Sequence, residues 1–178
     1  LHERRMIRFS LTKRGDVGAF CVSKKNGKLR LIIDCRQLNQ KLKHPPRTHL
    51  ASSAAFCEVW VPGGQSVYYC SHDVADCFYQ LRIPRRLSLY LGLRSVFAKD
   101  FGITRINGKP VGPEQKVYPL LSVLPMGFSF ALHWAQVGHQ NILARAGIGP
   151  VGNFLVDFAP PPDICLLYTS PSPRDPIG

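Results

Sequence analysis

The sequence has few acidic residues and no long hydrophobic run. The 178-residue chain has only 11 Asp and Glu residues but 23 Lys and Arg residues, so its formal net charge is +12. No stretch of eighteen apolar residues is present, which argues against a membrane-spanning helix. The start also lacks the basic, apolar and small-residue order of a signal peptide. With 45% hydrophobic residues, the chain is too apolar for intrinsic disorder. We therefore expect an intracellular protein, cytoplasmic or nuclear, with a core of its own.

Disulfide and zinc patterns are missing as well. The six cysteines include no C-x-x-C pair, and no Cys/His cluster has zinc-finger spacing. A disulfide framework is not expected in a chain of this length without a secretory signal. We interpret the cysteines as reduced thiols, most of them buried.

Positive charge is concentrated at the front of the chain. Residues 1–49 hold 13 basic and 3 acidic residues, a net of +10, whereas residues 50–164 hold 9 and 7, a net of +2. Such a field favours a polyanionic partner, either nucleic acid or a nucleotide phosphate. An ordinary solvated face is the alternative interpretation.

The end of the chain has an unusual composition. Residues 165–175 read C-L-L-Y-T-S-P-S-P-R-D, which matches the translation of a sequencing-library adapter, and residues 176–178 would then be translated barcode. A natural Ser/Pro-rich disordered tail is the alternative. We expect residues 165–178 to be an artefactual tail and not a domain, with the natural sequence cut off near Ile164.

Hydrophobic periodicity and turn residues predict an α+β fold. Two strands over 17–23 and 29–34 should form a hairpin through the turn at 24–28. Further strands are expected over 67–72, 89–93, 95–98, 117–123 and 151–156, with a hairpin turn at Asn107-Gly108. A helix is expected over 129–146, where Ser129 should cap the first turn and Gly147 should end the helix. Residues 36–43 should form a short helix or an irregular segment, and residues 76–80 a turn or a short helix.

Two acidic residues follow apolar, β-rich runs. Asp73 comes after residues 67–71, and Asp157 comes after residues 154–156. A carboxylate at the end of a buried strand is costly unless it is paired or metal-bound. Two of them on neighbouring strands would suit divalent cations for in-line phosphoryl transfer, and oxygen ligands suit Mg²⁺. Taken singly, each Asp is better explained as a turn former or helix cap.

Four motifs in the same order resemble those of retroelement reverse transcriptases. Residues 24–39 contain K-K-N-G-K-L-R and D-C-R-Q-L-N, similar to the fingers motif of that family. Residues 73–83 read D-V-A-D-C-F-Y-Q-L-R-I, similar to its first catalytic palm motif. Residues 124–136 begin with L-P-M-G-F and end in Gln, and F-L-V-D at 154–157 lies where the [YF]-x-D-D motif belongs. The ordered set is much more specific than any motif alone.

The resemblance implies an α+β fold with reverse-transcriptase-like fingers and palm. The palm would be an antiparallel sheet backed by helices, truncated before the thumb. Residues 1–50 would be a basic fingers segment and residues 51–164 the palm, with fingers insertions within 84–120.

The resemblance also implies roles for single residues. Asp73 and Asp157, with the backbone carbonyl of Val74, would bind two Mg²⁺ ions, with Mn²⁺ as the alternative. Lys24 and Arg30 would bind the incoming triphosphate; an ordinary solvated turn is the other interpretation of this basic stretch.

The remaining implied roles concern the nucleotide pocket. Backbone N–H groups of Asp76 and Cys77 would also face the triphosphate. Phe78 would exclude a ribose 2′-hydroxyl, although a plain core residue is the alternative. Met126 and Gly127 would line the nucleotide pocket, and Gln136 would lie on the following helix, near the template groove.

The implied activity is that of an RNA-directed DNA polymerase. It would add deoxynucleotides to a primer 3′-hydroxyl on an RNA or DNA template and release pyrophosphate. We expect the chain as given to be inactive, because gripping the primer and template needs the missing parts. No membrane partner is expected, and the sequence does not indicate an oligomeric state.

Two departures from the family pattern keep alternatives open. Phe158 stands where the family has a second acid, and a proline run follows at 160–162. A non-catalytic nucleic-acid-binding remnant is therefore one alternative. An RNA-directed RNA polymerase is a second, which Phe78 opposes, and a basic α+β structural module with chance motif matches is a third.

Overall fold

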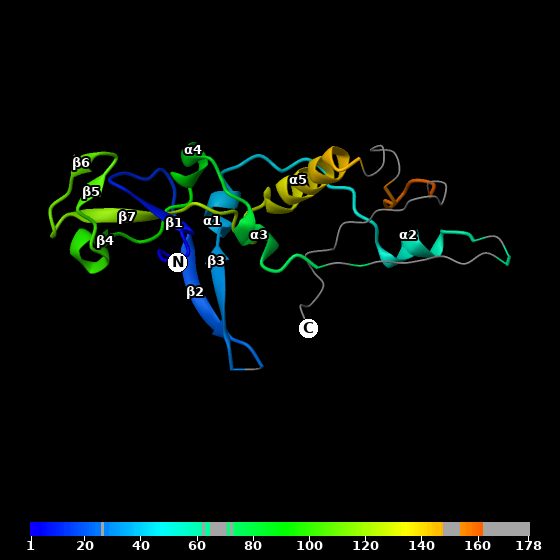
Figure 1. The fold of residues 1–178 in the computed structure, drawn as a ribbon, viewed down its shortest axis with the longest axis horizontal. Helices are drawn as coiled ribbons and strands as arrows, with labels where there is room; N and C mark the ends of the chain where they lie inside the picture. The colour runs from blue at the N-terminus through cyan, green and yellow to red at the C-terminus, as the bar shows by residue number, and fades with distance from the viewer. Residues whose placement is uncertain (26, 62, 65–70, 72, 148–153, 162–178) are drawn as a thin grey trace. The chain divides into compact units, whose positions relative to one another are not determined.

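The chain divides into two compact units. The computed structural model describes residues 1–25, 27–61, 63–64, 71, 73–147 and 154–161. Residues 1–45 and 76–131 form the first unit, and residues 46–75 and 132–178 form the second. Antiparallel sheets and short helices make the described part a mixed α+β structure, as predicted (Figure 1). The predicted division at residue 50 into fingers and palm stays a prediction.

The first unit contains a three-stranded antiparallel sheet. Its strands are β1 (Ile7–Ser10), β7 (Lys116–Leu121) and β4 (Val96–Phe97), with β7 in the middle. Leu121 pairs with Ile7, and Val117 pairs with Val96. β7 carries successive buried apolar residues because it lies between two strands and within the core. The strands predicted over 95–98 and 117–123 are confirmed in their central parts.

Two hairpins complete the β-structure of this unit. β2 (Gly18–Ser23) pairs with β3 (Leu29–Asp34), from Gly18 opposite Asp34 to Ser23 opposite Leu29. β5 (Arg105–Ile106) pairs with β6 (Lys109–Pro110) around Asn107 and Gly108. Both turn residues have positive φ, 52° and 80°, as a tight hairpin turn requires. Both hairpins confirm the sequence prediction. Figure 1 shows β2 and β3 as a two-stranded arm.

Short helices connect these strands and cover the core. They are α1 (Arg36–Asn39), α3 (Cys77–Gln80), α4 (Arg85–Ser88) and the 3₁₀ helix η1 (Ala98–Phe101). The main core cluster joins side chains from β1, β3, α1, β7 and the segments beside them: Ile7, Val17, Ile33, Cys35, Leu38, Ile83, Leu91, Leu121, Leu124, Phe128 and Ala131. A smaller cluster of Ala98, Ile106, Val111 and Val117 lies under β4 and the second hairpin.

The second unit contains α2 (Ser53–Cys57) and most of α5 (Ala131–Arg145). The predicted long helix is confirmed, and Gly147 ends it with a φ of 72° and a hydrogen bond to the Ala144 carbonyl of 3.1 Å. The predicted cap is wrong. The Oγ of Ser129 is buried and has no hydrogen-bond partner among the described residues. Its backbone N–H is held instead by the side chain of Asn39, at 3.0 Å.

Another predicted element is replaced by a turn. Residues 89–93 do not form a strand, because the N–H groups of Tyr90 and Leu91 donate to the Leu87 and Ser88 carbonyls and continue the turn of α4. Within 89–93, only Gly92 forms isolated bridges. Leu155 and Val156, predicted as the end of a strand, belong to no strand. The rest of that prediction (151–153), most of the strand predicted over 67–72, and the tail at 165–178 lie outside the described residues.

The burial of the cysteines and the character of the helices can be compared with what the composition predicts. Of the four described cysteines, Cys35 is buried, Cys77 is half-buried, and Cys21 and Cys57 are exposed. The expectation that most cysteines are buried is therefore wrong for this set; Cys21, for example, lies on a two-stranded arm whose β2 residues are all exposed. Among the described helices, none combines the length and apolar character that crossing a bilayer requires.

Candidate functional site

The basic arm is the first part of the candidate site. Its turn is closed by hydrogen bonds from Lys24 N to the Lys28 carbonyl, at 2.7 Å, and from Gly27 N to the Lys24 carbonyl, at 3.0 Å. Gly27 has a φ of 74°, which favours glycine. Arg30 is exposed and pairs with Val22 across the arm. The predicted triphosphate ligands Lys24 and Arg30 therefore lie at the turn end of one hairpin.

The loop at 125–129 is held against the base of this arm. The side-chain amide of Asn39 donates to the Gly127 carbonyl at 2.9 Å, and its Oδ1 accepts from Ser129 N at 3.0 Å. A Cβ at position 127 would lie 2.5 Å from the carbonyl oxygen of Ile33. Only glycine allows the loop to approach β3 this closely. The first and third motifs thus meet at one place, and Met126 stands 56% exposed beside it.

The part of the second motif from Asp76 onward joins the other two motifs in the first unit. Asp76 adopts a left-handed conformation, with φ 51° and ψ 34°, and opens α3. After α3, Leu124 N donates to the Leu81 carbonyl at 2.9 Å, which ties the end of the second motif to the start of the third. The Tyr79 hydroxyl reaches the Leu31 carbonyl on β3, at 3.5 Å. Phe78 is half-buried and packs against the main core cluster.

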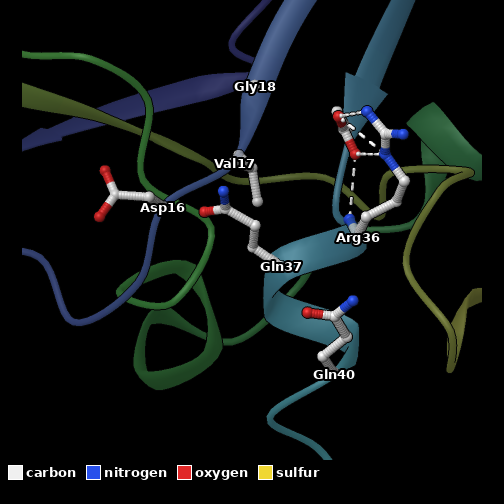
Figure 2. Close-up of a pocket in the computed structure, with 7 residues that line it drawn as sticks. Asp16, Val17, Gly18, Arg36, Gln37 and Gln40 are labelled. Atoms are coloured by element: carbon white, nitrogen blue, oxygen red, sulfur yellow. Dashed lines mark hydrogen bonds and ion pairs between the residues drawn. The ribbon is translucent and has the colours of Figure 1, made fainter.

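Two pockets lie at the base of the arm. The larger, of about 600 Å³, is lined by Asp16, Val17, Gly18, Asp34, Arg36, Gln37 and Gln40. Figure 2 shows Gln37 pointing from α1 toward Val17, with Gln40 further along the same helix. The second, of about 340 Å³, has a mainly apolar lining that includes Phe20, Ile32 and Gly127. Amide and carboxylate groups thus contribute to the lining of the larger pocket, and apolar groups form most of the lining of the smaller one.

An ion pair between Asp34 and Arg36 lines both pockets. Arg36 Nη2 lies 2.6 Å from Asp34 Oδ2, and Arg36 Nε lies 2.9 Å from Asp34 Oδ1. The hydrogen bonds from Arg36 lower the pKa of the Asp34 carboxyl from 3.8 to about 2. Burial, together with the charge of Asp34, raises the pKa of the Cys35 thiol to about 12. Cys35 is therefore a core thiol and not a nucleophile at neutral pH.

The two predicted catalytic acids belong to the second unit. Asp157 Oδ1 accepts hydrogen bonds from Ser52 N, at 2.8 Å, and Ser52 Oγ, at 2.7 Å, and Asp157 N donates to the Leu50 carbonyl at 3.1 Å. Ser52 is the N-cap of α2, so Asp157 supports the start of that helix. Asp73 and Val74 are exposed.

These acids do not make a complete metal site as they are placed. One oxygen of Asp157 is occupied by Ser52. Among the residues that the structure describes, no three His, Cys, Asp or Glu side chains gather where they would hold a metal ion. Cation binding would require Asp73 and Asp157 to act together with ligands from outside this set, such as substrate phosphates.

Phe158 has an unfavourable backbone conformation for its residue type. Its φ is 64°, and its side chain is fully exposed. A left-handed conformation is uncommon for a bulky residue, whereas Asn and Asp adopt it more readily. The position therefore suits the acidic residue that the family pattern has there better than it suits phenylalanine.

Gln136 lies within α5 and is 7% exposed. Its Oε1 is buried and has no hydrogen-bond partner among the described residues. The predicted template contact of Gln136 stays a prediction.

Several pocket residues were not singled out from the sequence. Asp16, Gln37 and Gln40 line the larger pocket, and Asn39 holds the 125–129 loop. The D-x-R-x-L-N segment at 34–39 contains two of these residues, Gln37 and Asn39. The short helix after β3 turns Gln37 toward the same side as Gln40, which directly follows the helix. Asp16 has no such local signal.

Compared with known proteins, the chain matches no family model and no curated sequence. The interpretation of the site therefore depends on the motifs and on the contacts between them.

Proposed function

We propose that the chain contains the nucleotide-binding part of an RNA-directed DNA polymerase of the reverse-transcriptase type. The observation that carries this proposal is the junction of three motifs in the first unit. Asn39 joins the first motif to the third, and Leu81 joins the second to the third. Motif segments as far as 90 residues apart in sequence thus share one site. Chance motif matches in a structural module would have no reason to converge in this way.

The chemistry of the junction is suited to a nucleoside triphosphate. A basic arm with Lys24 and Arg30 offers charge for phosphates, and Met126 and Gly127 lie at its base. Asp73 and Asp157 would hold magnesium and supply the charge stabilisation that phosphoryl transfer needs. Nucleic acid would serve as template and primer, and deoxynucleotides as substrates.

Primer extension with magnesium tests the proposal. In a full-length parent protein, Asp73→Asn should abolish extension on an RNA template, with less than a twofold loss in primer–template affinity, because it removes a metal ligand and not a nucleic-acid contact. Glu58→Gln is the matched control, since Glu58 is an exposed acid of the same unit. Extension that survives in Asp73→Asn would contradict the assignment.

A non-catalytic nucleic-acid-binding remnant is the second candidate. The strained, exposed Phe158 and the bond between Asp157 and Ser52 favour it. Primer–template binding without any magnesium-dependent extension or deoxynucleotide binding would support this candidate. An RNA-directed RNA polymerase would instead extend the primer with ribonucleotides as readily as with deoxynucleotides.

A further inference from the structure

Three arginines of the first unit, none of them in the basic arm, lie together around the end of the second motif. Arg8 is on β1, Arg82 lies between α3 and α4, and Arg85 is the first residue of α4. The Nη2 of Arg8 donates to the Ile83 carbonyl at 3.3 Å, so its guanidinium reaches the segment that carries the other two. Desolvation, followed by the positive charges of Arg85 and Arg82, lowers the pKa of Arg8. The positive charges of Arg82 and Arg85 therefore act unfavourably on that of Arg8.

Neutral groups hold the side chains of Arg8 and Arg82 in place. Arg82 Nη1 donates to the Arg5 carbonyl and lies 3.3 Å from Ser122 Oγ. Ser122 Oγ in turn donates to the same Arg5 carbonyl, at 2.8 Å. The ion pairs found in the described part of the chain join Lys13 to Asp16, Arg36 to Asp34 and Lys99 to Glu114. No carboxylate of that part pairs with Arg8, Arg82 or Arg85.

Clustered guanidinium groups without a counter-charge are destabilising by themselves. The fold nevertheless fixes Arg8 and Arg82 through carbonyl and hydroxyl groups, which orient the side chains but leave their charge in place. Each guanidinium has five N–H donors in a planar fork that matches the oxygens of a phosphate group. Such a pre-oriented cluster has the chemistry of a phosphate site.

We propose that Arg8, Arg82 and Arg85 form a second anion site, which binds a backbone phosphate of a nucleic-acid strand. The first unit favours a nucleic acid over a free anion, because it carries 20 basic and 6 acidic residues, a net charge of +14. The site is separate from the basic arm and needs neither Asp73 nor Asp157. It would therefore exist in a polymerase and in a non-catalytic remnant alike.

Binding of a short single-stranded RNA to the full chain tests the site. Arg85→Gln should weaken binding about tenfold at low salt, because one charge-assisted phosphate contact is lost. The slope of log affinity against log salt should become shallower by about 0.7, the value for one phosphate on a single strand. Arg94→Gln is the matched control, since Arg94 is an exposed arginine of the same unit. It should change affinity less than twofold.

Two further measurements make the result decisive. Arg85→Gln should not lower the Tm, because it relieves repulsion within the cluster, so weaker binding would not reflect unfolding. Arg85→Lys, which keeps the charge but loses the planar fork, should fall between the wild type and Arg85→Gln. Equal losses in Arg85→Gln and Arg94→Gln would overturn the proposal and leave only diffuse attraction.

Inorganic phosphate distinguishes a free anion from a nucleic-acid phosphate as the ligand of this site. It should compete with RNA in the wild type and raise its Tm, and both effects should be smaller in Arg85→Gln. If phosphate raises the Tm through Arg85 but RNA affinity is the same in Arg85→Gln and Arg94→Gln, the site binds a free anion. That outcome would overturn the nucleic-acid proposal.

Discussion

Gly127 occupies a position at which a larger residue cannot fit without movement. A Cβ there would lie 2.5 Å from the Ile33 carbonyl oxygen, which is backbone and cannot rotate away. Gly127→Ala should lower the free energy of unfolding by about 1–3 kcal/mol, as overpacking does, measured by urea denaturation. Gly112→Ala is the control, because a Cβ at that position meets nothing within 4 Å. Similar stabilities for the two variants would show that the 125–129 loop is not held tightly against β3.

The pair formed by Asp34 and Arg36 should give the fold a defined pH dependence. Because the folded-state pKa of Asp34 is depressed to about 2, the stability from this group is fully present above pH 3.8 and is lost as the pH falls toward 2. In Arg36→Gln, the pKa of Asp34 should return toward 3.8, measured by NMR titration of the carboxyl carbon. The pair lies at the surface, so 1 M salt should reduce the shift in the wild type. A low pKa that persists in Arg36→Gln would assign the shift to another cause.

The hairpins are the elements that the sequence predicts best. Their signals are local: a turn at Gly27 in one and at Asn107-Gly108 in the other, where residues with positive φ close the hairpin. The register of β2 with β3 follows once the turn is fixed. The α+β class follows in turn from the mixture of such hairpins with one long helix.

Other elements depend on contacts that a local pattern does not contain. Residues 89–93 have strand-like composition, but the turn of α4 continues through Tyr90 and Leu91, and within 89–93 only Gly92 forms isolated bridges. Ser129 has the residue type and position of a helix cap, yet Asn39, 90 residues away, takes its backbone N–H. The motif residues were predicted as a set, whereas the Asn39 contacts that join them were not, because sequence spacing alone does not indicate long-range hydrogen bonds.

The start of α2 offers a test that separates a structural from a catalytic role of Asp157. Asp157→Ala should destabilise the chain by about 1–2 kcal/mol, since Ser52 N and Oγ lose their acceptor. Asp157→Asn keeps an acceptor oxygen and should cost less than about 0.5 kcal/mol, while removing the charge needed for magnesium. The measurements are urea denaturation of both variants, and primer extension by both variants of a full-length parent protein.

Ser52→Ala is the control for this pair of variants, because it removes the cap hydroxyl and leaves the carboxylate. It should cost about 1 kcal/mol, as loss of an N-cap does, and should leave any extension activity in place. If Asp157→Asn keeps full activity, Asp157 is only a helix-supporting residue and the metal assignment is wrong.

At the scale of the whole molecule, charge is divided between the two units. The first unit has 20 basic and 6 acidic residues, a net of +14, whereas the second has 3 and 5, a net of −2. The concentration of charge in residues 1–49 is thus part of a larger asymmetry, to which Arg82, Arg85 and their neighbours add. The predicted catalytic acids Asp73 and Asp157 both belong to the unit of negative charge, which is suited to cations and not to a polyanion.

This asymmetry predicts where a nucleic acid protects the chain. With a short single-stranded RNA at low salt and without magnesium, amide hydrogen exchange should slow in the β2–β3 arm and in residues 81–88, and change little in α2. The reason is that a polyanion is attracted to uncompensated positive charge and releases its counterions there. A peptide nucleic acid of the same base sequence has an uncharged backbone and should give no such protection. At 0.5 M salt the protection by RNA should also disappear, because salt screens the attraction between the phosphates and the basic side chains. Protection centred on α2, or equal protection by the uncharged analogue, would contradict an electrostatic origin of nucleic-acid binding.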